Sequence, residues 1–520
     1  DPDQILTVLQ SLLSDEKIFS PTSVYGDGFS AEKIVPIIKQ AIAETAEASS
    51  YEQEVQHKGS IRLTFNDLGI KKVCIIGLGY IGLPTAILAA EHGFEVVGVD
   101  IDTQRVEKIN GGDPVIQEPE VFEKLQCVLN AGRFRATTTA QMADFFIIAV
   151  PTPCKIDKTA DISFVFNAVK AFMSVIKKGD VIILESTVPV GTTQRLAQLV
   201  QNETGLQVGT DIFVAHCPER VLPGNIFYEL INNARIIGGI DCESANRAAA
   251  LYKEFVQGDL HLTDAPTAEL VKLVENSSRD TQIAFAHQVA SMAYSAGIDP
   301  YEVIELANKH PRVNILNPTC GVGGHCIAVD PWFLIETFPK QSLLLKASRA
   351  INDAKPIETI RCIQKAVEQW QPNHEKKCTV LVFGLTYKAD VDDIRESPAL
   401  LIARHLATLP TIDLLVYEPH ISKSKIDELF EDRTVSLTEG LHKADIVVFL
   451  VAHNRFKAID VKMLATKKVL DFCGILHQRK PKSDQKEYLF WPVSSNKLDR
   501  VENIQTFDDT FTNKGQESSS

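Results

Sequence analysis

The sequence predicts an α/β protein in which two doubly wound lobes are joined by a central helical segment with a long helix. Three observations predict this fold. Short buried-strand runs alternate with helix-length segments from residue 71, the pattern becomes mostly helical from about residue 266, and a second alternating region begins at residue 376. A length of 520 residues gives room for about three domains.

Each lobe is predicted from its own strands. Apolar runs at 73–76, 94–100, 145–150, 181–184 and 212–215 predict buried parallel strands in the first lobe, and runs at 379–384, 413–417 and 445–450 predict those of the second. Asp100 and Glu418 each end the second strand of a lobe, so the lobes resemble weak internal repeats. Residues 1–45 are predicted as two amphipathic helices around a turn, and residues 46–70 as a polar linker.

Composition narrows the function classes. The 53 basic and 67 acidic side chains give a net charge of −14, which disfavours nucleic acid or an anionic membrane as the main partner. Ten scattered cysteines with no C-x-x-C pair are typical of reduced thiols in a cytoplasmic protein, and no signal peptide is visible. Residues 73–90 carry no charge, but Gly77, Gly79, Gly82 and Pro84 interrupt any membrane-spanning helix there.

A glycine-rich turn follows the first strand of the first lobe. Gly77, Gly79 and Gly82 have the G-x-G-x-x-G spacing that lets backbone N–H groups approach a pyrophosphate at a helix N-terminus. Asp100 ends the next strand 18 residues after Gly82, where a carboxylate binds the adenosine ribose. A carboxylate there repels a 2′-phosphate, so the pair predicts NAD rather than NADP, although Arg105 lies nearby in the sequence.

The second lobe has only Gly384 at the matching turn, so we do not expect it to bind a dinucleotide in the same way. The loop that follows is charged and includes Lys388 and Arg395. Cations at the carboxyl end of a sheet suit a phosphate-bearing ligand. A solvated surface loop is the alternative.

A glycine-framed cysteine lies between the lobes in the sequence, within residues 321–330. Glycines around Cys326 allow a ligand to approach its sulfur, and His325 can lower the pKa of a neighbouring thiol, which favours a nucleophile. A buried structural cysteine is the plainer interpretation. A zinc site from Cys320, His325 and Cys326 is disfavoured, because adjacent side chains do not easily face one tetrahedral ion, and we predict no metal.

A helix predicted around residues 268–276 places Lys272 and Asn276 on one face, at i and i+4. A cation and an amide on one face can stabilise a developing oxyanion. The alternative is a solvated surface pair.

Taken together, these residues show a resemblance to a known family. From about residue 70 to 500 the chain resembles the UDP-glucose/GDP-mannose dehydrogenase family. The matching motifs, in order, are the dinucleotide turn, Val150-Pro-Thr-Pro153, Glu185-Ser-Thr-Val-Pro-Val-Gly-Thr-Thr193, Cys217-Pro-Glu-Arg220, the Lys272/Asn276 helix, Gly-Gly-His-Cys326, and Phe383-Gly-Leu-Thr-Tyr-Lys388 through Arg395-Glu-Ser-Pro398.

The resemblance implies an enzyme that uses two NAD and no metal to oxidise a sugar C6 alcohol to the acid. Cys326 would capture the aldehyde, Lys272 and Asn276 would stabilise the oxyanion, and Asp330 would orient water. Glu219 and Thr187 would belong to the same water and base network. The implied substrate contacts are Glu219, Arg220, Lys272, Asn276, Arg312, Gly323 and Lys388. The implied cofactor contacts are Gly77, Gly79, Tyr80, Ile81, Gly82, Asp100, Arg105, Pro151, Thr152, Thr187 and Arg395.

The resemblance also implies a domain plan of Rossmann-like lobes. Residues 71–265 would bind NAD, 266–360 would form the central helical and dimerisation domain, 376–505 would bind the UDP-sugar, and 506–520 would be a tail. The enzyme would be a homodimer or higher homo-oligomer in which Arg312 reaches across the interface. Residues 1–45 resemble the C-terminal tail of non-hydrolysing UDP-N-acetylglucosamine 2-epimerases, which suggests a natural fusion; a coincidental helical extension is the alternative.

The sequence around the nucleophile bears on the substrate. Cys326 is followed by Ile-Ala-Val-Asp-Pro-Trp, where enzymes that oxidise UDP-glucose usually have Cys-x-Pro-Lys-Asp. This departure resembles the branch that oxidises UDP-N-acetyl-D-mannosamine. The same reaction on UDP-N-acetylglucosamine or UDP-glucose is the alternative. A two-electron hydroxyacid dehydrogenase, or a module that only senses NAD or a sugar nucleotide, would not need Cys326 and Lys272 together.

Overall fold

The computed structural model describes residues 72–116, 118–221, 224–370 and 376–477. The predicted epimerase-like segment 1–45, the linker 46–70 and the tail 506–520 lie outside the described residues. All of the described residues belong to one of the two units of the chain.

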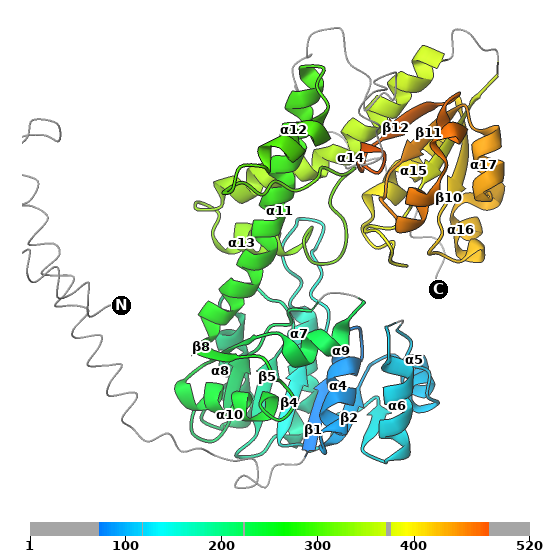
Figure 1. Cartoon of the computed structure of the whole chain (residues 1–520). Coiled ribbons are helices and arrows are strands. Elements are labelled where there is room, and N and C mark those ends of the chain that lie inside the picture. Colours follow the sequence, from blue (N-terminus) through cyan, green and yellow to red (C-terminus); the bar gives the residue numbers. More distant parts are fainter. Residues whose placement is uncertain (1–71, 117, 222–223, 371–375, 478–520) are drawn as a thin grey trace, which may run out of the picture. The chain divides into compact units, whose positions relative to one another are not determined.

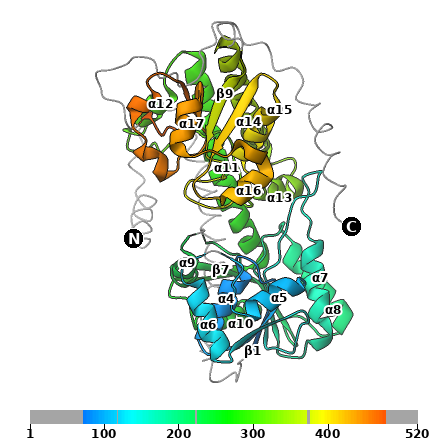
Figure 2. The ribbon, with the colours of Figure 1, turned by 90° about the vertical axis from the view of Figure 1, so that its right-hand side faces the viewer.

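The first lobe is built on one sheet with helices packed against it (Figures 1 and 2). Within the described residues this sheet has eight strands in the order β3-β2-β1-β4-β5-β6-β7-β8. The strands are β1 (Lys72–Ile76), β2 (Glu95–Val99), β3 (Phe134–Thr137), β4 (Phe145–Ile148), β5 (Val181–Leu184), β6 (Phe213–His216), β7 (Arg235–Gly239) and β8 (Leu260–Asp264). The helical elements are α4 (Gly82–Glu91), α5 (Thr103–Asn110), α6 (Val121–Asn130), α7 (Ser163–Phe172), η1 (Met173–Val175), α8 (Thr192–Thr204), α9 (Ile226–Asn232) and α10 (Cys242–Tyr252).

Strand order and burial confirm the doubly wound fold. The order reverses between β1 and β4, and ligands bind at such a switch point outside the carboxyl ends of the strands. Every residue of β4 and β5 is buried, as expected for strands covered on both faces. The expectation of parallel pairing is wrong at one place, because β6 and β7 pair antiparallel through Ala215 with Gly239 and His216 with Gly238.

The second lobe repeats the core of the first on a smaller scale. Its described strands have the parallel order β10-β9-β11-β12, which matches β2-β1-β4-β5 and confirms the internal repeat. The strands are β9 (Cys378–Phe383), β10 (Ile412–Tyr417), β11 (Ile446–Phe449) and β12 (Lys468–Asp471). The helical elements are α15 (Pro398–Thr408), α16 (Lys423–Phe430), η3 (Glu431–Arg433), α17 (Leu437–Lys443), η4 (Asn454–Ala458) and η5 (Val461–Leu464).

Helices connect the two sheets in the chain. They are α11 (Ala265–Ser295), α12 (Pro300–Ala307), α13 (Asp330–Thr337) and α14 (Leu343–Trp370). The predicted long helix is α11, which begins where Asp264 accepts a hydrogen bond from the Thr267 N–H. It packs along α14 around a buried ion pair, in which Arg349 Nη1 lies 2.6 Å from Asp280 Oδ1. Among the described residues, no helix combines the length and apolar character needed to cross a bilayer.

Candidate active site

The glycine turn of the first lobe has the geometry that a dinucleotide needs. Gly77 has a φ of +96°, and a Cβ there would lie 2.6 Å from the Ala149 carbonyl oxygen. A Cβ on Gly82 would lie 1.8 Å from the Gly77 carbonyl oxygen. Helix α4 begins with no side-chain cap and no acidic residue in its first turn, so its N-terminal amides can receive an anion. These residues fit the pyrophosphate of NAD.

Asp100 lies beside this turn, at the carboxyl end of β2. Its Oδ2 accepts a hydrogen bond from the Leu78 N–H at 3.0 Å, and its Oδ1 accepts one from the Asp102 N–H at 3.0 Å. Arg105 Nη1 is 3.9 Å from Asp100 Oδ2. The next residue, Ile101, is 91% exposed, and this apolar surface was not singled out from the sequence. The carboxylate and the exposed isoleucine are thus placed where a ribose and a base would lie.

The other candidate cofactor residues lie at the carboxyl ends of neighbouring strands. The loops after β4 and β5 are joined by the Thr152 hydroxyl, which donates to the Thr187 carbonyl oxygen at 2.6 Å. Pro151 lies in the same loop as Thr152, and Tyr80 and Ile81 lead from the glycine turn into α4. The Tyr80 hydroxyl donates to Glu118, a residue that the sequence did not indicate.

Five of the predicted catalytic residues converge from three parts of the chain. Lys272 and Asn276 come from α11, and Glu219 follows β6. Cys326 lies in the loop before α13, and Asp330 is the first residue of that helix. Asn276 Nδ2 donates to Asp330 Oδ2 at 2.5 Å, and Lys272 Nζ lies 3.7 Å from Glu219 Oε2. The Asp330 N–H donates to the Cys326 carbonyl oxygen at 2.9 Å. The side chain of Lys272 is only 7% exposed, so the solvated-pair alternative is wrong for it.

The pKa values in this cluster are mutually shifted. Burial raises the pKa of Asp330 to about 6, although Lys272 and Asn276 oppose the change. Burial alone would lower the pKa of Lys272, but Glu219, Asp330 and Cys326 outweigh it and the pKa is raised. A carboxyl group titrates near neutrality only when its environment raises its pKa in this way, and groups with shifted pKa values cluster at functional sites.

The pKa of the Cys326 thiol differs from the value that the sequence suggested. Cys326 is exposed, so a ligand can reach it, yet the protein packed around it desolvates the thiol and raises its pKa to about 12, with Asp330 adding to the increase and Lys272 opposing it. The sequence suggested a lowered pKa for this thiol beside His325, whereas the structure raises it. At neutral pH Cys326 carries its proton and must transfer it when it attacks a substrate.

The structure gives a different reason for glycine at the positions around Cys326 than the one inferred from the sequence. A Cβ on Gly321 would lie 2.7 Å from Pro398 Cβ, and one on Gly323 would lie 2.4 Å from the Glu396 carbonyl oxygen. A Cβ on Gly324, whose φ is +83°, would lie 2.8 Å from the Tyr387 ring. The glycines are needed because a loop of the second lobe packs directly on them.

A pocket of about 440 Å³ adjoins the catalytic cluster. Arg220 lines it and is held by two partners. Its Nη2 lies 2.6 Å from Glu275 Oε1, its Nε donates to Glu275 Oε2 at 3.2 Å, and its Nη1 donates to the Ala234 carbonyl oxygen at 2.8 Å. The pocket is lined by Arg220, Val221, Asn233, Ala234, Lys272, Glu275 and Asn276. The sequence indicated three of these residues and missed the other four, which contain no recognisable motif.

The remaining candidates lie near the surface. Arg395 is 61% exposed and pairs with Asp393 at 2.7 Å, and its charge reaches Cys326. Arg312 and Lys388 are exposed.

The three residues of the disfavoured zinc site are not grouped together. Cys320 is buried and donates its S–H to the Leu450 carbonyl oxygen at 3.5 Å. Across the described ranges, the only metal-type grouping of side chains is Asp390, His420 and His453, so Cys320, His325 and Cys326 do not converge.

Comparison with known proteins decides the family. Models of the UDP-glucose/GDP-mannose dehydrogenase family match three segments: its NAD binding domain at 71–256, its central domain at 266–354 and its UDP binding domain at 381–478. The chain belongs to this family. It is accordingly a UDP-sugar dehydrogenase, an oxidoreductase that uses NAD.

Relatives in this family are similar over most of their length. A UDP-N-acetyl-D-mannosamine dehydrogenase of Campylobacter jejuni is 45% identical over 412 residues, which are 77% of this chain and 99% of that protein. An NDP-N-acetyl-D-galactosaminuronic acid dehydrogenase of Ralstonia solanacearum is 42% identical over 416 residues, 79% of this chain and 97% of that protein. The solved UDP-D-ManNAc dehydrogenase of Pyrococcus horikoshii is 38% identical, with a TM-score of 0.72 over 78% of this chain and 96% of that one.

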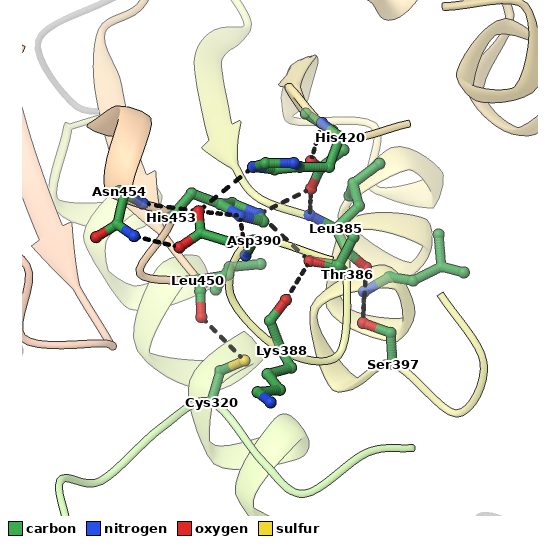
Figure 3. A network of polar contacts seen from close by, with 12 residues as sticks. Cys320, Leu385, Thr386, Lys388, Asp390, Ser397, His420, Leu450, His453 and Asn454 are labelled. Carbon is green, nitrogen blue, oxygen red and sulfur yellow. Dashed lines mark hydrogen bonds and ion pairs between the residues drawn. The ribbon is translucent and has the colours of Figure 1, made fainter. Parts of the chain in front are cut away.

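The UDP-binding lobe of this family member repeats the carboxylate geometry of the NAD-binding lobe. Glu418 Oε2 accepts a hydrogen bond from the Leu385 N–H at 2.7 Å and its Oε1 accepts one from the His420 N–H at 2.8 Å, as Asp100 does with Leu78 and Asp102. Gly384 has a φ of +90°, close to that of Gly77. The loop that carries Lys388 follows this turn (Figure 3).

Proposed function

We propose that the protein oxidises the C6 alcohol of UDP-N-acetyl-D-mannosamine to the carboxylate, giving UDP-N-acetyl-D-mannosaminuronate. The observation that carries this proposal is the convergence of a reachable thiol with a buried lysine, an amide and a carboxylate: Cys326, Lys272, Asn276 and Asp330. NAD, when bound at the glycine turn, supplies the hydride acceptor. A simple alcohol oxidation has no use for a nucleophile, whereas oxidation through to the acid does.

The reaction we propose has four stages. The C6 alcohol loses a hydride and a proton and becomes an aldehyde. The Cys326 sulfur then bonds to the aldehyde carbon, and the thiol proton leaves. The resulting thiohemiacetal loses a second hydride together with its hydroxyl proton and becomes a thioester. Water finally breaks the carbon–sulfur bond, which releases the acid and regenerates the thiol. Covalent capture keeps the reactive aldehyde in the site between the two oxidations.

The surrounding side chains suit the charges that this sequence creates. Each oxidation passes through an oxygen that carries negative charge, and Lys272 and Asn276 are placed to stabilise it. Lys272 stays cationic because Glu219 and Asp330 raise its pKa. We propose that Arg220 and Gly323 contact the sugar and that Lys388 contacts the diphosphate. We also propose that Glu219 and Thr187 order water, and that Arg395 contacts the cofactor.

Two further features complete the proposal. We propose a homodimer or higher oligomer in which Arg312 enters the site of a second copy. We place the reaction in the cytoplasm, because all ten cysteines are free, as expected in a reducing compartment.

The choice of sugar rests on the relatives and is tested by comparing sugars. Rates of NADH release should be measured with UDP-N-acetylmannosamine, UDP-N-acetylglucosamine and UDP-glucose. We expect kcat/KM to be highest for UDP-N-acetylmannosamine, with about two NADH for each sugar consumed. A higher value for either other sugar would reject the substrate. One NADH for each sugar, with free aldehyde in solution, would reject the covalent route.

The pH dependence tests the role of Asp330. Burial raises the pKa of Asp330 to about 6, so we propose that its carboxylate accepts the proton that Cys326 gives up. Above about pH 6 the carboxylate is ionised and can act, and below that pH it is lost. We expect kcat/KM to fall about tenfold for each pH unit below this value. In Asp330→Asn this acidic limb should be absent and the rate lower throughout. An unchanged limb would assign the base to a group other than Asp330.

A further inference from the structure

Two histidines and an aspartate form a cluster at the carboxyl ends of the second-lobe strands (Figure 3). Asp390 lies in the loop after β9, His420 follows β10 and His453 follows β11. Lys388, two residues before Asp390, extends its side chain away from the two imidazoles (Figure 3). Lys388, the side chain that we propose contacts the diphosphate, therefore belongs to a loop whose next residues enter this cluster.

His453 is the centre of the cluster and is buried, with no exposed side-chain surface. Its Nδ1 accepts a hydrogen bond from the Asp390 N–H at 2.9 Å. Its Nε2 lies 3.1 Å from Glu418 Oε2, a carboxylate oxygen that can only accept. The two partners fix one tautomer, in which Nε2 carries the proton and Nδ1 presents its lone pair to the loop.

The loop depends on these contacts because its backbone is strained. Asp390 has a φ of +59°, an unfavourable value for a residue other than glycine. Asn454, the neighbour of His453, holds the Asp390 side chain: its N–H donates to Oδ1 at 2.9 Å and its Nδ2 donates to Oδ2 at 2.5 Å. The Thr386 hydroxyl, 3.3 Å from His453 Nε2, donates to the Lys388 carbonyl oxygen at 2.7 Å. Contacts from the residues that follow β11, together with the Thr386 hydroxyl, thus set the path of residues 386–390.

We propose that His453 is a positioning residue that holds the Lys388 loop in the conformation that binds the diphosphate of the UDP-sugar. It does so by accepting the Asp390 N–H while Glu418 anchors the opposite side of its ring. The inference rests on the proposed function, since that function places Lys388 against the substrate. It assigns to His453 an effect on nucleotide affinity and not on the oxidation steps.

A metal site is the competing interpretation, because ligand atoms of Asp390, His420 and His453 lie within 4.8 Å of one another. Two observations favour the loop-holding role. The lone pair of His453 Nδ1 already accepts the Asp390 N–H. The two imidazoles are stacked, with ring centroids 4.7 Å apart and planes at 30°, whereas in-plane lone pairs must converge on a bound ion.

Three substitutions at His453 separate its two hydrogen bonds. In His453→Asn the amide oxygen replaces Nδ1 and can still accept the Asp390 N–H, and Glu418 keeps its two backbone donors. In His453→Gln the amide nitrogen replaces Nε2, so the contact with Glu418 is kept and the contact with the loop is lost. His453→Leu removes both, and His442→Leu, at an exposed histidine on α17, is the matched control.

The readouts are the Kd for UDP alone by calorimetry, and the KM for UDP-sugar and for NAD. We expect Leu and Gln at position 453 to raise the Kd for UDP and the KM for UDP-sugar about tenfold, as the loss of one hydrogen bond does. Asn should stay within about twofold of the wild type, and kcat and the KM for NAD should change much less than the KM for UDP-sugar.

The proposal would be overturned if His453→Asn and His453→Gln lost UDP affinity equally. It would also be overturned if kcat and the KM for NAD changed as much as the KM for UDP-sugar. Either result would leave His453 a general structural role. A metal centre would be established instead if EDTA lowered the UDP affinity of the wild type and Zn²⁺ restored it. The same treatment should then have no effect on the UDP affinity of His420→Ala. Because UDP binding is measured without turnover, failure of the proposed oxidation in the wild type would be seen separately.

Discussion

Replacing Cys326 with serine is expected to lower formation of the uronic acid by at least about 10³-fold, which is the scale of removing a catalytic nucleophile. The serine hydroxyl is a far weaker nucleophile than sulfur, so the aldehyde from the first oxidation would not be captured. The glycine turn that binds NAD lies in the first lobe, between β1 and α4, whereas Cys326 precedes α13 in the segment between the lobes. NAD affinity should therefore remain within about twofold of the wild type.

Acid formation is measured by mass spectrometry of the sugar nucleotide, and NAD binding by quenching of protein fluorescence. The matched control is Cys154→Ser. Its thiol is also near the site, with its sulfur 4.0 Å from the Val329 carbonyl oxygen, but it has no part in the proposed chemistry. This control should retain turnover. Acid formation by Cys326→Ser at the wild-type rate would refute the covalent route.

The strands predicted from the sequence are those with a run of several apolar residues. Residues 145–148 and 181–184 are buried on both faces, so their composition alone indicates them. Strand β7 was missed because it begins with Arg235 and ends with two glycines. In the structure Arg235 is buried next to Glu185, 3.4 Å away, and a Cβ on Gly238 would lie 2.4 Å from the Asp264 carbonyl oxygen. Both features depend on residues distant in the sequence, so no local pattern could show them.

The candidate site also contains some features that the sequence predicted and others that only the folded structure shows. The spacing of Lys272 and Asn276 along one helix placed both on one face, and the structure adds Asp330 as the partner of that amide at 2.5 Å. The thiol pKa and the reason for the glycine frame were not predictable. Gly323 approaches Glu396, 73 positions further along the chain, and the raised pKa of Cys326 follows from packing and from two carboxylates on separate elements. Such effects exist only after the chain has folded.

The cluster around His453 shows the same limit at a position that no motif indicated. Asp390 was one of several charges in a loop that the sequence could equally place in solvent. Its left-handed backbone and its contact with His453 arise from the meeting of the β9 and β11 loops. The internal repeat was visible in sequence through Asp100 and Glu418, whereas the histidine that packs on Glu418 in only one lobe was not.

Lys272→Met is expected to lower kcat by about 10²- to 10³-fold, which is the scale of removing one group that stabilises a developing oxyanion. The lysine is the cation that faces Glu219, Asp330 and Cys326, and it is nearly fully buried. Without it, the pKa of Asp330 should rise further, because Lys272 opposes the effect of burial there. The acidic limb of the pH–rate profile should therefore move to higher pH.

A second variant separates catalysis from charge balance. Lys272→Met alone leaves Glu219 without its cationic partner, which destabilises the fold as well as the transition state. Lys272→Met with Glu219→Gln removes both charges, so thermal denaturation should return toward the wild-type midpoint while kcat stays as low as in the single variant. Recovery of kcat together with stability would show that Lys272 serves only to balance Glu219, and it would remove the oxyanion role from the proposed mechanism.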